Sequence, residues 1–424
     1  MKTLLLGGGG RESAIAWALA KSPMVSELHC APGNAGTLSL AHNHEIDPCD
    51  PQEVVEFASR QQVDLVVIGP EAPLVAGVAD ALRAKGIPVF GPGRAGAKLE
   101  GSKAFAKEFM KSHGIPTAPF RVCTTVREAE EALRMRTAPF VVKADGLAAG
   151  KGAFLLDTFE EAISTARDLL ENGMLGEAGE TVVIEDFLPG RELTILAVSD
   201  GKTFRLLPES QDHKRAFDGG LGPNTGGMGA FSPVPWIDSQ LKETIVRTVV
   251  EPTLAGLKKD GIDFRGVLYC GLMIDRSGSL NLLEYNVRMG DPETQVVLPS
   301  FRGDFAHVAL ACATGELASV AWPSASDCSV GVVMASGGYP GKYETGFAIS
   351  GLDDLAALEN VIAFHAGTRT KGTGVVTSGG RVLTVVGSGP TLGEARENAY
   401  NGVRMIDFSK AHYRKDIASG IGGC

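Results

Sequence analysis

The residues from Val141 to Gly152 have the composition of a polyphosphate-binding segment. An apolar strand ends at Lys143, and a loop rich in glycine and alanine follows it. Backbone N–H groups in such a loop can donate hydrogen bonds to phosphate oxygens, and the lysine supplies a fixed positive charge. The spacing of a Walker loop is absent. The pattern therefore favours a flap that folds over phosphates, and an ordinary flexible hairpin is the alternative.

A second group of polar side chains lies on an expected strand that spans residues 280–288. Because side chains alternate along a strand, Glu284, Asn286 and Arg288 should share one face. A carboxylate and an amide oxygen are hard ligands that suit Mg²⁺ beside nucleotide phosphates, and an arginine can bind phosphate oxygens bidentately. The pattern predicts a metal-binding and phosphate-binding strand, with a polar face turned to solvent as the alternative. The opposite face should be buried through Leu283, Tyr285 and Val287.

Four glycines, Gly7 to Gly10, connect the first apolar strand to a helix. This arrangement presents backbone N–H groups and the positive end of a helix to an anion. A dinucleotide site is not favoured, because the second strand ends in Cys30-Ala31-Pro32-Gly33-Asn34 and lacks an acid for a ribose diol. Gly8 and Gly10 are therefore candidates for binding a phosphate or a substrate, and a tight strand–helix turn is the alternative.

The elements that position these residues fall into three expected domains. Residues 1–101 alternate strands (3–6, 27–30, 63–68, 88–90) with helices (12–20, 51–60, 75–85), which predicts a parallel, Rossmann-like α/β sheet. Residues 102–327 begin with a helix at 101–112 and include a small α+β lobe at about 122–191, built from strands 140–144, 153–156 and 181–187 and helix 158–170. Strands 193–198 and 204–207, a long helix at 239–257 and a hairpin of strands 267–275 and 280–288 follow. Residues 328–424 hold strands at 330–334, 361–365, 375–376 and 381–386 and a closing helix at 392–406.

Composition excludes several classes of protein. The formal net charge of −10 provides no basic footprint for nucleic acid. The seven cysteines show neither metal-ligand nor disulfide spacing, which suits free thiols in a reducing cytosol. No stretch approaches the ~18 uninterrupted apolar residues of a membrane span. These features predict a cytoplasmic protein with neither nucleic acid nor membrane as a partner.

The order of these motifs resembles a known superfamily. Lys143 with its glycine loop, the strand at 182–188 and Glu284-x-Asn286 are similar to ATP-grasp enzymes. The run from Arg288 to Gln295 is similar to the signature of the phosphoribosylamine–glycine ligase family. Residues 31–36, 211–215, 222–229, 365–368 and 379–382 match that family as well, so the resemblance spans the chain.

The resemblance implies an ATP-dependent ligase that joins glycine to 5-phosphoribosylamine for purine synthesis, with Mg²⁺ or Mn²⁺. It implies a central ATP-grasp domain whose small lobe is a mobile lid, and a small mixed carboxyl-terminal domain. It places ATP at Lys103, Lys143, Gly150, Gly152, Glu185, the backbone of Leu188, and Glu192. It places the metal at Glu284 and Asn286, and the substrates at Gly8, Gly10, Asp212, Lys214, Asn224, Asp291 and Arg381. Catalytic roles fall to Lys143, Arg288 and Asp291.

The chain differs from the family pattern in three places, one of which is Gly93, where a serine usually follows Gly91-Pro92. Ser13 stands where a histidine usually follows Arg11-Glu12. The strand before Glu284, which reads Tyr269-Cys270-Gly271-Leu272-Met273, offers no second acidic metal ligand, so phosphates would have to hold a second ion. The number of metal ions is therefore open, and so are the roles of His213 and Ser13.

The expected chemistry begins with transfer of the ATP γ-phosphate to the glycine carboxylate, because a free carboxylate has no competent leaving group. The amine of 5-phosphoribosylamine then attacks glycyl phosphate. Two other interpretations are another ATP-grasp carboxylate–amine ligase of purine synthesis and a nucleotide-binding regulator that has lost activity. The sequence does not determine the oligomeric state, and a monomer is one option it leaves open.

Overall fold

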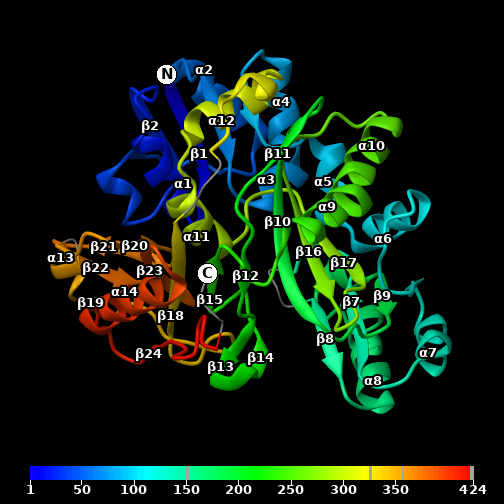
Figure 1. The fold of residues 1–424 in the computed structure, drawn as a ribbon. Coiled ribbons are helices and arrows are strands. Elements are labelled where there is room, and N and C mark those ends of the chain that lie inside the picture. Colours follow the sequence, from blue (N-terminus) through cyan, green and yellow to red (C-terminus); the bar gives the residue numbers. More distant parts are fainter. Residues whose placement is uncertain (149–151, 324–326, 356, 421–424) are drawn as a thin grey trace.

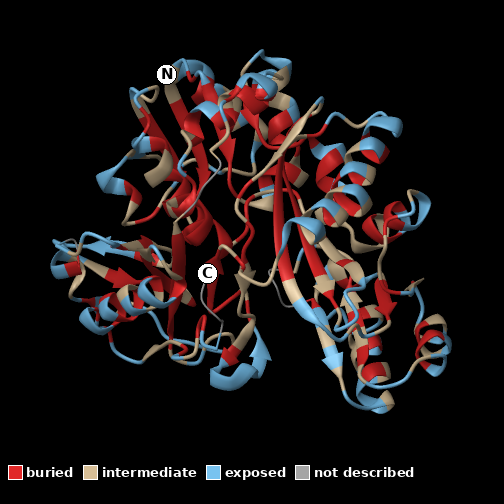
Figure 2. Ribbon diagram, in the orientation of Figure 1, coloured by how far each residue is buried: buried red, intermediate tan, exposed pale blue. Residues whose placement is uncertain are grey.

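The computed structural model describes residues 1–148, 152–323, 327–355 and 357–420. Within these residues the strands form four larger sheets and two small ones, and helices flank them (Figure 1). Burial follows this arrangement: the strands are mostly buried, whereas helices such as α8 (Phe159–Leu170) and α14 (Leu392–Met405) keep an exposed outer face (Figure 2). Among the described residues, no helix has the length and apolar character needed to cross a membrane.

The amino-terminal sheet is parallel throughout and has the strand order β3-β2-β1-β4-β5. Strand β1 is buried on both faces because helices cover both sides of the sheet, which explains its uninterrupted leucines. The strand order reverses between β1 and β4, so the loops after these two strands open at one crevice. The expected Rossmann-like arrangement is confirmed. Its elements are β1 (Lys2–Gly7), α1 (Gly10–Ala20), β2 (Glu27–Pro32), β3 (His42–Asn43), α2 (Pro51–Gln61), β4 (Leu65–Ile68), α3 (Glu71–Ala76), α4 (Val78–Ala84), β5 (Val89–Phe90) and α5 (Arg94–Gly101).

The small lobe is an antiparallel sheet, in the order β6-β9-β7-β8, packed against two helices. It has a hydrophobic core of its own, to which Val142, Leu169 and Ile184 belong. Helix α6 (Lys103–Ser112) leads into the lobe. The elements of the lobe are β6 (Phe120–Cys123), α7 (Val126–Arg134), β7 (Phe140–Ala144), β8 (Ala153–Leu156), α8 and β9 (Val182–Glu185).

The central sheet is antiparallel, in the order β11-β10-β16-β17. Its long strands β10 (Arg191–Asp200) and β16 (Arg265–Ile274) pair over their whole length and place β17 (Leu280–Asn286) at the edge. Helices α11 (Glu293–Ser300) and α12 (Phe305–Thr314) follow β17 and lie in the core. The remaining elements are β11 (Phe204–Leu206), α9 (Ser239–Ile245), a π-helical turn (Val246–Val250) and α10 (Glu251–Lys259).

The carboxyl-terminal sheet has the order β12-β15-β18-β23-β20, with β24 also paired to β18. Two of its strands, β12 (Gln211–Asp212) and β15 (Gly229–Ser232), come from the middle of the chain, so this sheet connects the substrate candidate Asp212 to the last third of the protein. Helix α14 covers β23 and β18. The other elements are the hairpin β13 (Arg215–Phe217) and β14 (Leu221–Asn224), then β18 (Cys328–Ser336), β19 (Ala348–Ile349), α13 (Leu352–Leu355), β20 (Val361–His365), β21 (Thr368–Lys371), β22 (Gly374–Thr377), β23 (Arg381–Gly389) and β24 (Ala411–His412).

Three expected elements are corrected by the structure. The helix expected at 75–85 is two helices, because Gly77 adopts φ +87° and ends α3 before α4 begins. The helix expected at 101–112 begins at Lys103, where the Ser102 side chain accepts a hydrogen bond from the backbone N–H of Phe105, and a separate helix, α5, precedes it. Leu283 is not fully buried, because the β16–β17 register shifts beside Gly271 and Leu272 and leaves Leu283 as the extra residue.

Candidate active site

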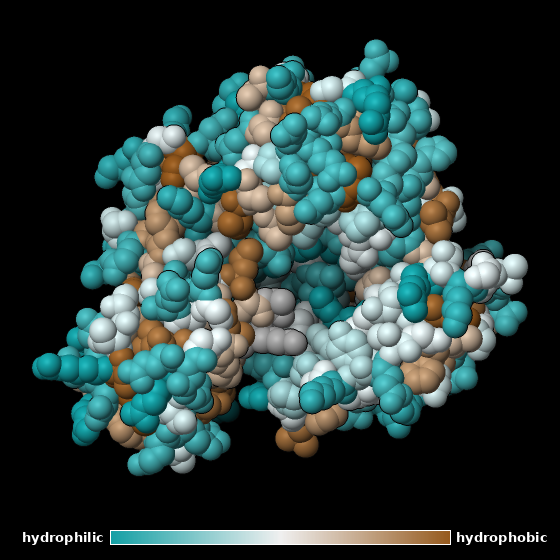
Figure 3. Space-filling view, turned by 180° about the vertical axis from the view of Figure 1, so that it is seen from behind, coloured by the Kyte–Doolittle hydropathy of each residue, from teal (hydrophilic) through white to brown (hydrophobic). Residues whose placement is uncertain are grey.

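A cleft of about 520 Å³ lies where the small lobe, the central sheet and the two terminal regions meet. This volume is in the range of pockets that bind nucleotides and other small molecules. Seen from behind, the molecule is hollowed near its centre, and hydrophilic residues lie within the hollow (Figure 3). Most of the candidate residues line the cleft: Lys103, Lys143, Gly152, Glu185, Leu188, Glu192, Asp212, Lys214, Asn224, Glu284, Asn286, Arg288, Asp291 and Arg381. Gly150 lies outside the described residues.

Lys103 is positioned by the start of helix α6. The Asp145 side chain accepts hydrogen bonds from the Ser102 hydroxyl at 3.0 Å and the Ala104 N–H at 2.6 Å, so the loop after β7 caps this helix. The Lys103 ammonium donates to the carbonyl of Gly146 at 3.1 Å. It forms no ion pair with any carboxylate of the described residues. Burial lowers the pKa of Lys103, and Glu284 opposes this effect. Its charge is therefore available to an anion in the cleft.

Lys143 lies near the end of β7, and its ammonium is 2.5 Å from Oε1 of Glu185. The other Glu185 oxygen, Oε2, is 2.5 Å from the ammonium of Lys107. Both carboxylate oxygens of Glu185 are therefore engaged by lysine ammonium groups. Burial alone would lower the pKa of Lys143, but the carboxylates of Glu185 and Glu284 raise it overall. Lys143 is therefore fully charged at neutral pH.

Glu284 and Asn286 lie on β17, as the alternation of its side chains predicts. Glu284 faces Gly271 across the sheet, and a Cβ at Gly271 would lie only 3.3 Å from Glu284 Cγ, so the glycine gives this side chain its space. Burial would raise the pKa of Glu284, but Lys214, Lys143 and Lys103 lower it overall. No hydrogen bond or ion pair with the described residues engages its carboxylate. A half-buried, ionised oxygen donor that no described residue engages fits a metal ion.

The donor set beside Glu284 is incomplete by itself. The Asn286 amide oxygen accepts a hydrogen bond from Arg288 at 3.1 Å and keeps a lone pair for a ligand. Within the described residues, no group of three or more His, Cys, Asp or Glu side chains could hold a metal. Phosphate oxygens and water would therefore have to complete the coordination of a Mg²⁺ ion here.

Arg288 is held by carboxylates that the sequence did not single out. Its guanidinium is 2.6 Å from Glu100 and 3.3 Å from Glu71, which follows β4. Arg11 lies 3.9 Å from the same Glu71. Burial would lower the pKa of Arg288, but Glu100 and Glu71 raise it. These ion pairs join the amino-terminal domain to β17 and fix the direction of the arginine.

Lys214 and Glu192 form an ion pair of 2.6 Å between β10 and the loop after β12. Asp212 is close to both, and Asn224 lines the cleft nearby. Burial raises the pKa of Asp212 to about 8, against the opposing effect of Lys214, and the nearby Glu293 and Glu192 raise it further. This carboxyl therefore changes its protonation state close to neutral pH.

Arg381 and Asp291 are brought together from β23 and from the loop before α11. The guanidinium lies 3.1 Å from Asp291 Oδ1, and it also donates to the backbone carbonyl of Gly226 at 2.6 Å. Gln295 donates to the same Asp291 oxygen at 2.8 Å. Burial would raise the pKa of Asp291, but Arg381 lowers it overall. Three stretches that the sequence singled out separately thus meet at one point.

The glycine loop after β1 lies beside this cluster without lining the cleft. A Cβ at Gly9 would be 3.7 Å from Asp291 Oδ2. Gly8 and Gly10 are not among the described residues that border the cavity. Packing accounts for both glycines, because a Cβ at Gly8 would lie 2.4 Å from the carbonyl of Gly33 and one at Gly10 would lie 2.7 Å from Gln295 Nε2. The N–H of Gly9 donates to Glu12 at 2.7 Å. These contacts favour the tight-turn alternative.

Ser13 and His213 have structural contacts. The Ser13 hydroxyl accepts a hydrogen bond from the backbone N–H of His365 at 3.2 Å. His213 Nε2 accepts from the N–H of Ala418 at 3.2 Å, and burial lowers the pKa of His213 to about 4, so the ring is neutral. Both residues connect distant parts of the chain.

Sequence reasoning missed several polar residues of the cleft. Lys107 is the easiest of these residues to predict, because it follows Lys103 by one helical turn and must lie on the same face of the helix. Glu71 follows the Gly69-Pro70 turn at the end of a buried strand, where ligands of such sheets bind. Glu293 accepts a hydrogen bond from the Tyr269 hydroxyl at 2.8 Å. Arg11 and Glu100 are also among the missed residues that line the cleft.

Comparisons with known proteins agree with this arrangement over the whole chain. Three family models match in order: the phosphoribosylglycinamide synthetase N domain over residues 1–100, its ATP-grasp (A) domain over 101–294 and its C domain over 329–420. A phosphoribosylamine–glycine ligase from Allochromatium vinosum is 48% identical over 419 residues, which are 98% of this chain and 98% of that protein.

Solved structures show the same relationship. The crystal structure of the phosphoribosylamine–glycine ligase from Thermotoga maritima has a TM-score of 0.87 and 39% identity, and the match covers 99% of this chain and 100% of that one. A biotin carboxylase domain from Hydrogenobacter thermophilus shares the fold alone, with a TM-score of 0.74 and 16% identity over 97% of this chain and 91% of that one. The chain therefore belongs to the phosphoribosylglycinamide synthetase family of ATP-grasp enzymes and has its activity, the ATP-dependent synthesis of glycinamide ribonucleotide.

Proposed function

We propose that the cleft joins glycine to 5-phosphoribosylamine by first making glycyl phosphate from glycine and ATP. The observation that carries this proposal is the convergence of Lys103, Lys143 and Glu284 on one cavity that also holds Asp212 and Arg381. The first three suit a terminal phosphate and its metal, and the last two suit the amine and phosphate of the second substrate. An inactive regulator would have no need of both groups.

ATP would lie between the small lobe and the central sheet. Lys103 and Lys143 contact its phosphates, the backbone at Leu188 holds the adenine edge, and Glu192 binds the ribose hydroxyls. Glu185 Oε1, which lacks an aligned donor, would accept a hydrogen bond from the adenine amino group. We assign the ATP phosphates also to Gly152, which lines the cleft, and to Gly150, which lies outside the described residues. Closure of the lobe would exclude water that would otherwise hydrolyse the anhydride.

Glu284 and Asn286 would hold Mg²⁺ or Mn²⁺ together with phosphate oxygens. The bound ion neutralises charge on the terminal phosphates. Arg288 follows β17, and its ion pairs with Glu100 and Glu71 fix its guanidinium in the lining of the cleft, where we assign it to the phosphate that is transferred. Arg288 thus stabilises the negative charge that the transfer shifts among the oxygens.

The two chemical steps balance as follows. A glycine carboxylate oxygen attacks the γ-phosphorus, the bond from this phosphorus to the β–γ bridging oxygen breaks, and ADP leaves. The amine nitrogen of 5-phosphoribosylamine then attacks the glycyl carbonyl carbon, and the carbon–oxygen bond to phosphate breaks. The amine must lose a proton in this step. We assign this proton to the ionised form of Asp212, whose carboxyl lines the cleft and is made a stronger base by the burial that raises its pKa.

The remaining substrate contacts follow from the cluster around Asp291. We assign the phosphate of 5-phosphoribosylamine to Arg381, and an amino group of the substrates to Asp291. Lys214 and Asn224 line the same cleft. We assign Gly8 and Gly10 to the substrate only through the shape that they give the loop after β1, which lies beside the Asp291 cluster and outside the lining of the cleft. We further propose that the protein is cytoplasmic and acts as a monomer. We propose domain boundaries at residues 1–101, 102–327 and 328–424.

Arg381→Ala should raise KM for 5-phosphoribosylamine by about tenfold or more and change KM for ATP by less than about threefold. The reason is that a guanidinium–phosphate contact at this position serves only one substrate. Steady-state kinetics with each substrate varied in turn would measure this. Arg369→Ala, which removes an exposed arginine on strand β21 of the separate three-stranded sheet, is the control. A similar rise in KM for all three substrates would instead indicate that Arg381 acts only through its hydrogen bonds to the backbone carbonyls of Gly226 and Asp291.

The proposed function is tested by measuring ADP formation with 5-phosphoribosylamine and a panel of amino acids. We expect turnover with glycine, and much lower rates with alanine and serine, because an added side chain must fit a site shaped for none. ADP formation that does not depend on 5-phosphoribosylamine, or a preference for another carboxylate, would contradict the assignment. It would favour another ATP-grasp ligase of purine synthesis.

A further inference from the structure

Glu185 is buried between two lysines that come from different parts of the fold. Its side chain is 2% exposed, and each of its oxygens lies 2.5 Å from one ammonium, Lys107 from α6 and Lys143 from β7. The two lysines differ in exposure, since Lys143 lines the mouth of the cleft at 12% and Lys107 lies deeper at 3%. One carboxylate is therefore shared by two ammonium groups, and Lys143 is the more exposed of the two.

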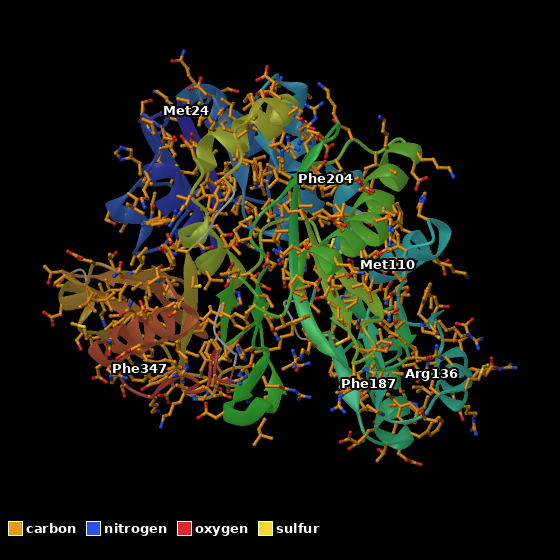
Figure 4. The ribbon with its side chains drawn as sticks, in the orientation of Figure 1. Met24, Met110, Arg136, Phe187, Phe204 and Phe347 are labelled. Atoms are coloured by element: carbon orange, nitrogen blue, oxygen red, sulfur yellow. The ribbon has the colours of Figure 1, made fainter. Side chains whose placement is uncertain are left out.

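Lys107 is fixed by more than its ion pair. Its ammonium donates a hydrogen bond to the Thr117 hydroxyl at 2.7 Å, and this hydroxyl donates to the carbonyl of Leu282 on β17 at 2.7 Å. Met110, which is labelled on α6 in Figure 4, lies nearly one turn further along the helix and is fully buried. These contacts hold Lys107 in the wall of the cleft between β17 and the small lobe, with its ammonium engaged by Glu185 and Thr117.

The contact between Lys143 and Glu185 conflicts with the role of Lys143 in phosphate binding. If Lys143 turns toward ATP and Glu185 has no other cation, a carboxylate is left buried and uncompensated, which is strongly destabilising. With Lys107 in place, the Glu185 charge stays paired when Lys143 moves. The combined effect is visible in Glu185 itself, since burial would raise its pKa but Lys143 and Lys107 lower it.

We propose that Lys107 is a positioning residue that keeps Glu185 neutralised, so that Lys143 can leave its ion pair and bind the phosphates of ATP. Lys107 acts through Glu185 and does not touch the nucleotide. This inference rests on the proposed role of Lys143. It gives Lys107 a part in ATP binding that the proposed function does not include. It predicts that the cost of losing Lys107 disappears when Glu185 is also neutral.

The test compares four proteins for binding of a non-hydrolysable ATP analogue by calorimetry: wild type, Lys107→Met, Glu185→Gln and the double variant. Lys107→Met should weaken binding by about tenfold or more relative to wild type. The double variant should bind within about threefold of Glu185→Gln, because no buried carboxylate then competes for Lys143. Lys111→Met removes an exposed lysine one turn further along α6 and should bind like wild type.

The inference is wrong if the Lys107→Met variant binds the analogue as tightly as wild type does. It is also wrong if Lys107→Met weakens binding by the same factor in the wild-type protein and in the Glu185→Gln variant. Thermal unfolding identifies a variant that fails to fold. If Lys107→Met does not fold, Lys107→Gln is used in its place, because its amide is polar but uncharged. The same weakening of binding is expected. Wild-type ADP formation with glycine and 5-phosphoribosylamine is measured alongside. If the wild type forms no ADP, the proposed function is wrong. If the wild type is active and Lys107→Met binds the ATP analogue as tightly as wild type does, only this inference is wrong.

Discussion

Lys143→Ala is expected to lower kcat/KM for ATP by about a hundredfold to a thousandfold while the protein remains folded. Loss of a positive charge that stabilises a transferring phosphate costs roughly 3 kcal/mol or more. The fold should tolerate the change, because Glu185 retains the ion pair with Lys107 at 2.5 Å. Steady-state kinetics and thermal unfolding together measure the two parts of this prediction.

Lys98→Ala provides the matched control for Lys143→Ala. Lys98 is an exposed lysine on α5, away from the lining of the cleft, so its removal should leave kcat/KM unchanged. Activity of Lys143→Ala within about threefold of wild type would exclude a role in phosphate transfer. A parallel loss of activity and of the unfolding midpoint would show a structural role instead.

Glu284→Gln and Asn286→Ala should each raise the Mg²⁺ concentration for half-maximal rate by about tenfold or more, since each weakens or removes a hard oxygen ligand. The effect should be larger for Glu284→Gln. Its carboxylate is surrounded by Lys214, Lys143 and Lys103 and supplies the only negative charge of the pair. A Mg²⁺ titration of the initial rate at saturating ATP measures this shift.

Asn281→Ala is the control for the metal ligands, because Asn281 belongs to the same strand but lies outside the lining of the cleft. Its metal dependence should match that of wild type. If the Mg²⁺ dependence of Glu284→Gln is also unchanged while KM for glycine rises, Glu284 belongs to the glycine site and the metal assignment is wrong.

Local patterns were sufficient to predict the parts of the fold where burial follows a simple period. The apolar runs of β1 and β4 and the helices between them predicted the parallel amino-terminal sheet. The alternation in β17 placed Glu284 and Asn286 on one face. The register shift at Leu283 could not be predicted, because it depends on the partner strand β16.

Several helices escaped prediction for identifiable reasons. Helices α11 and α12 are buried on nearly all sides, so neither shows the alternation of apolar and polar faces that reveals a surface helix. Helix α7 carries a usable signal that was overlooked, a capping box in which Thr125 and Glu128 bond reciprocally. Its short apolar face made the segment resemble a loop.

The residues of the site were easier to predict than their partners. Lys143, Glu284 and Arg381 occupy motifs that can be recognised one at a time in the sequence. The ion pair of Arg381 with Asp291 joins residues 90 positions apart, and that of Arg288 with Glu71 joins residues 217 apart. Such pairs depend on how the domains pack, and no local spacing encodes them. The role that we propose for Lys107 could not be predicted for the same reason, because it depends on the contact of Lys107 with Glu185, a residue distant in the sequence.

Transfer of oxygen from glycine to phosphate tests the central claim most directly. Glycine carrying ¹⁸O in both carboxylate oxygens is turned over with ATP and 5-phosphoribosylamine, and the inorganic phosphate and nucleotide products are analysed by mass spectrometry. If the carboxylate attacks the γ-phosphorus, one labelled oxygen enters inorganic phosphate in each turnover, the other stays in the amide, and the nucleotide is unlabelled ADP. Labelled AMP with pyrophosphate, or unlabelled phosphate beside ADP, would contradict a glycyl phosphate intermediate even if the product were glycinamide ribonucleotide.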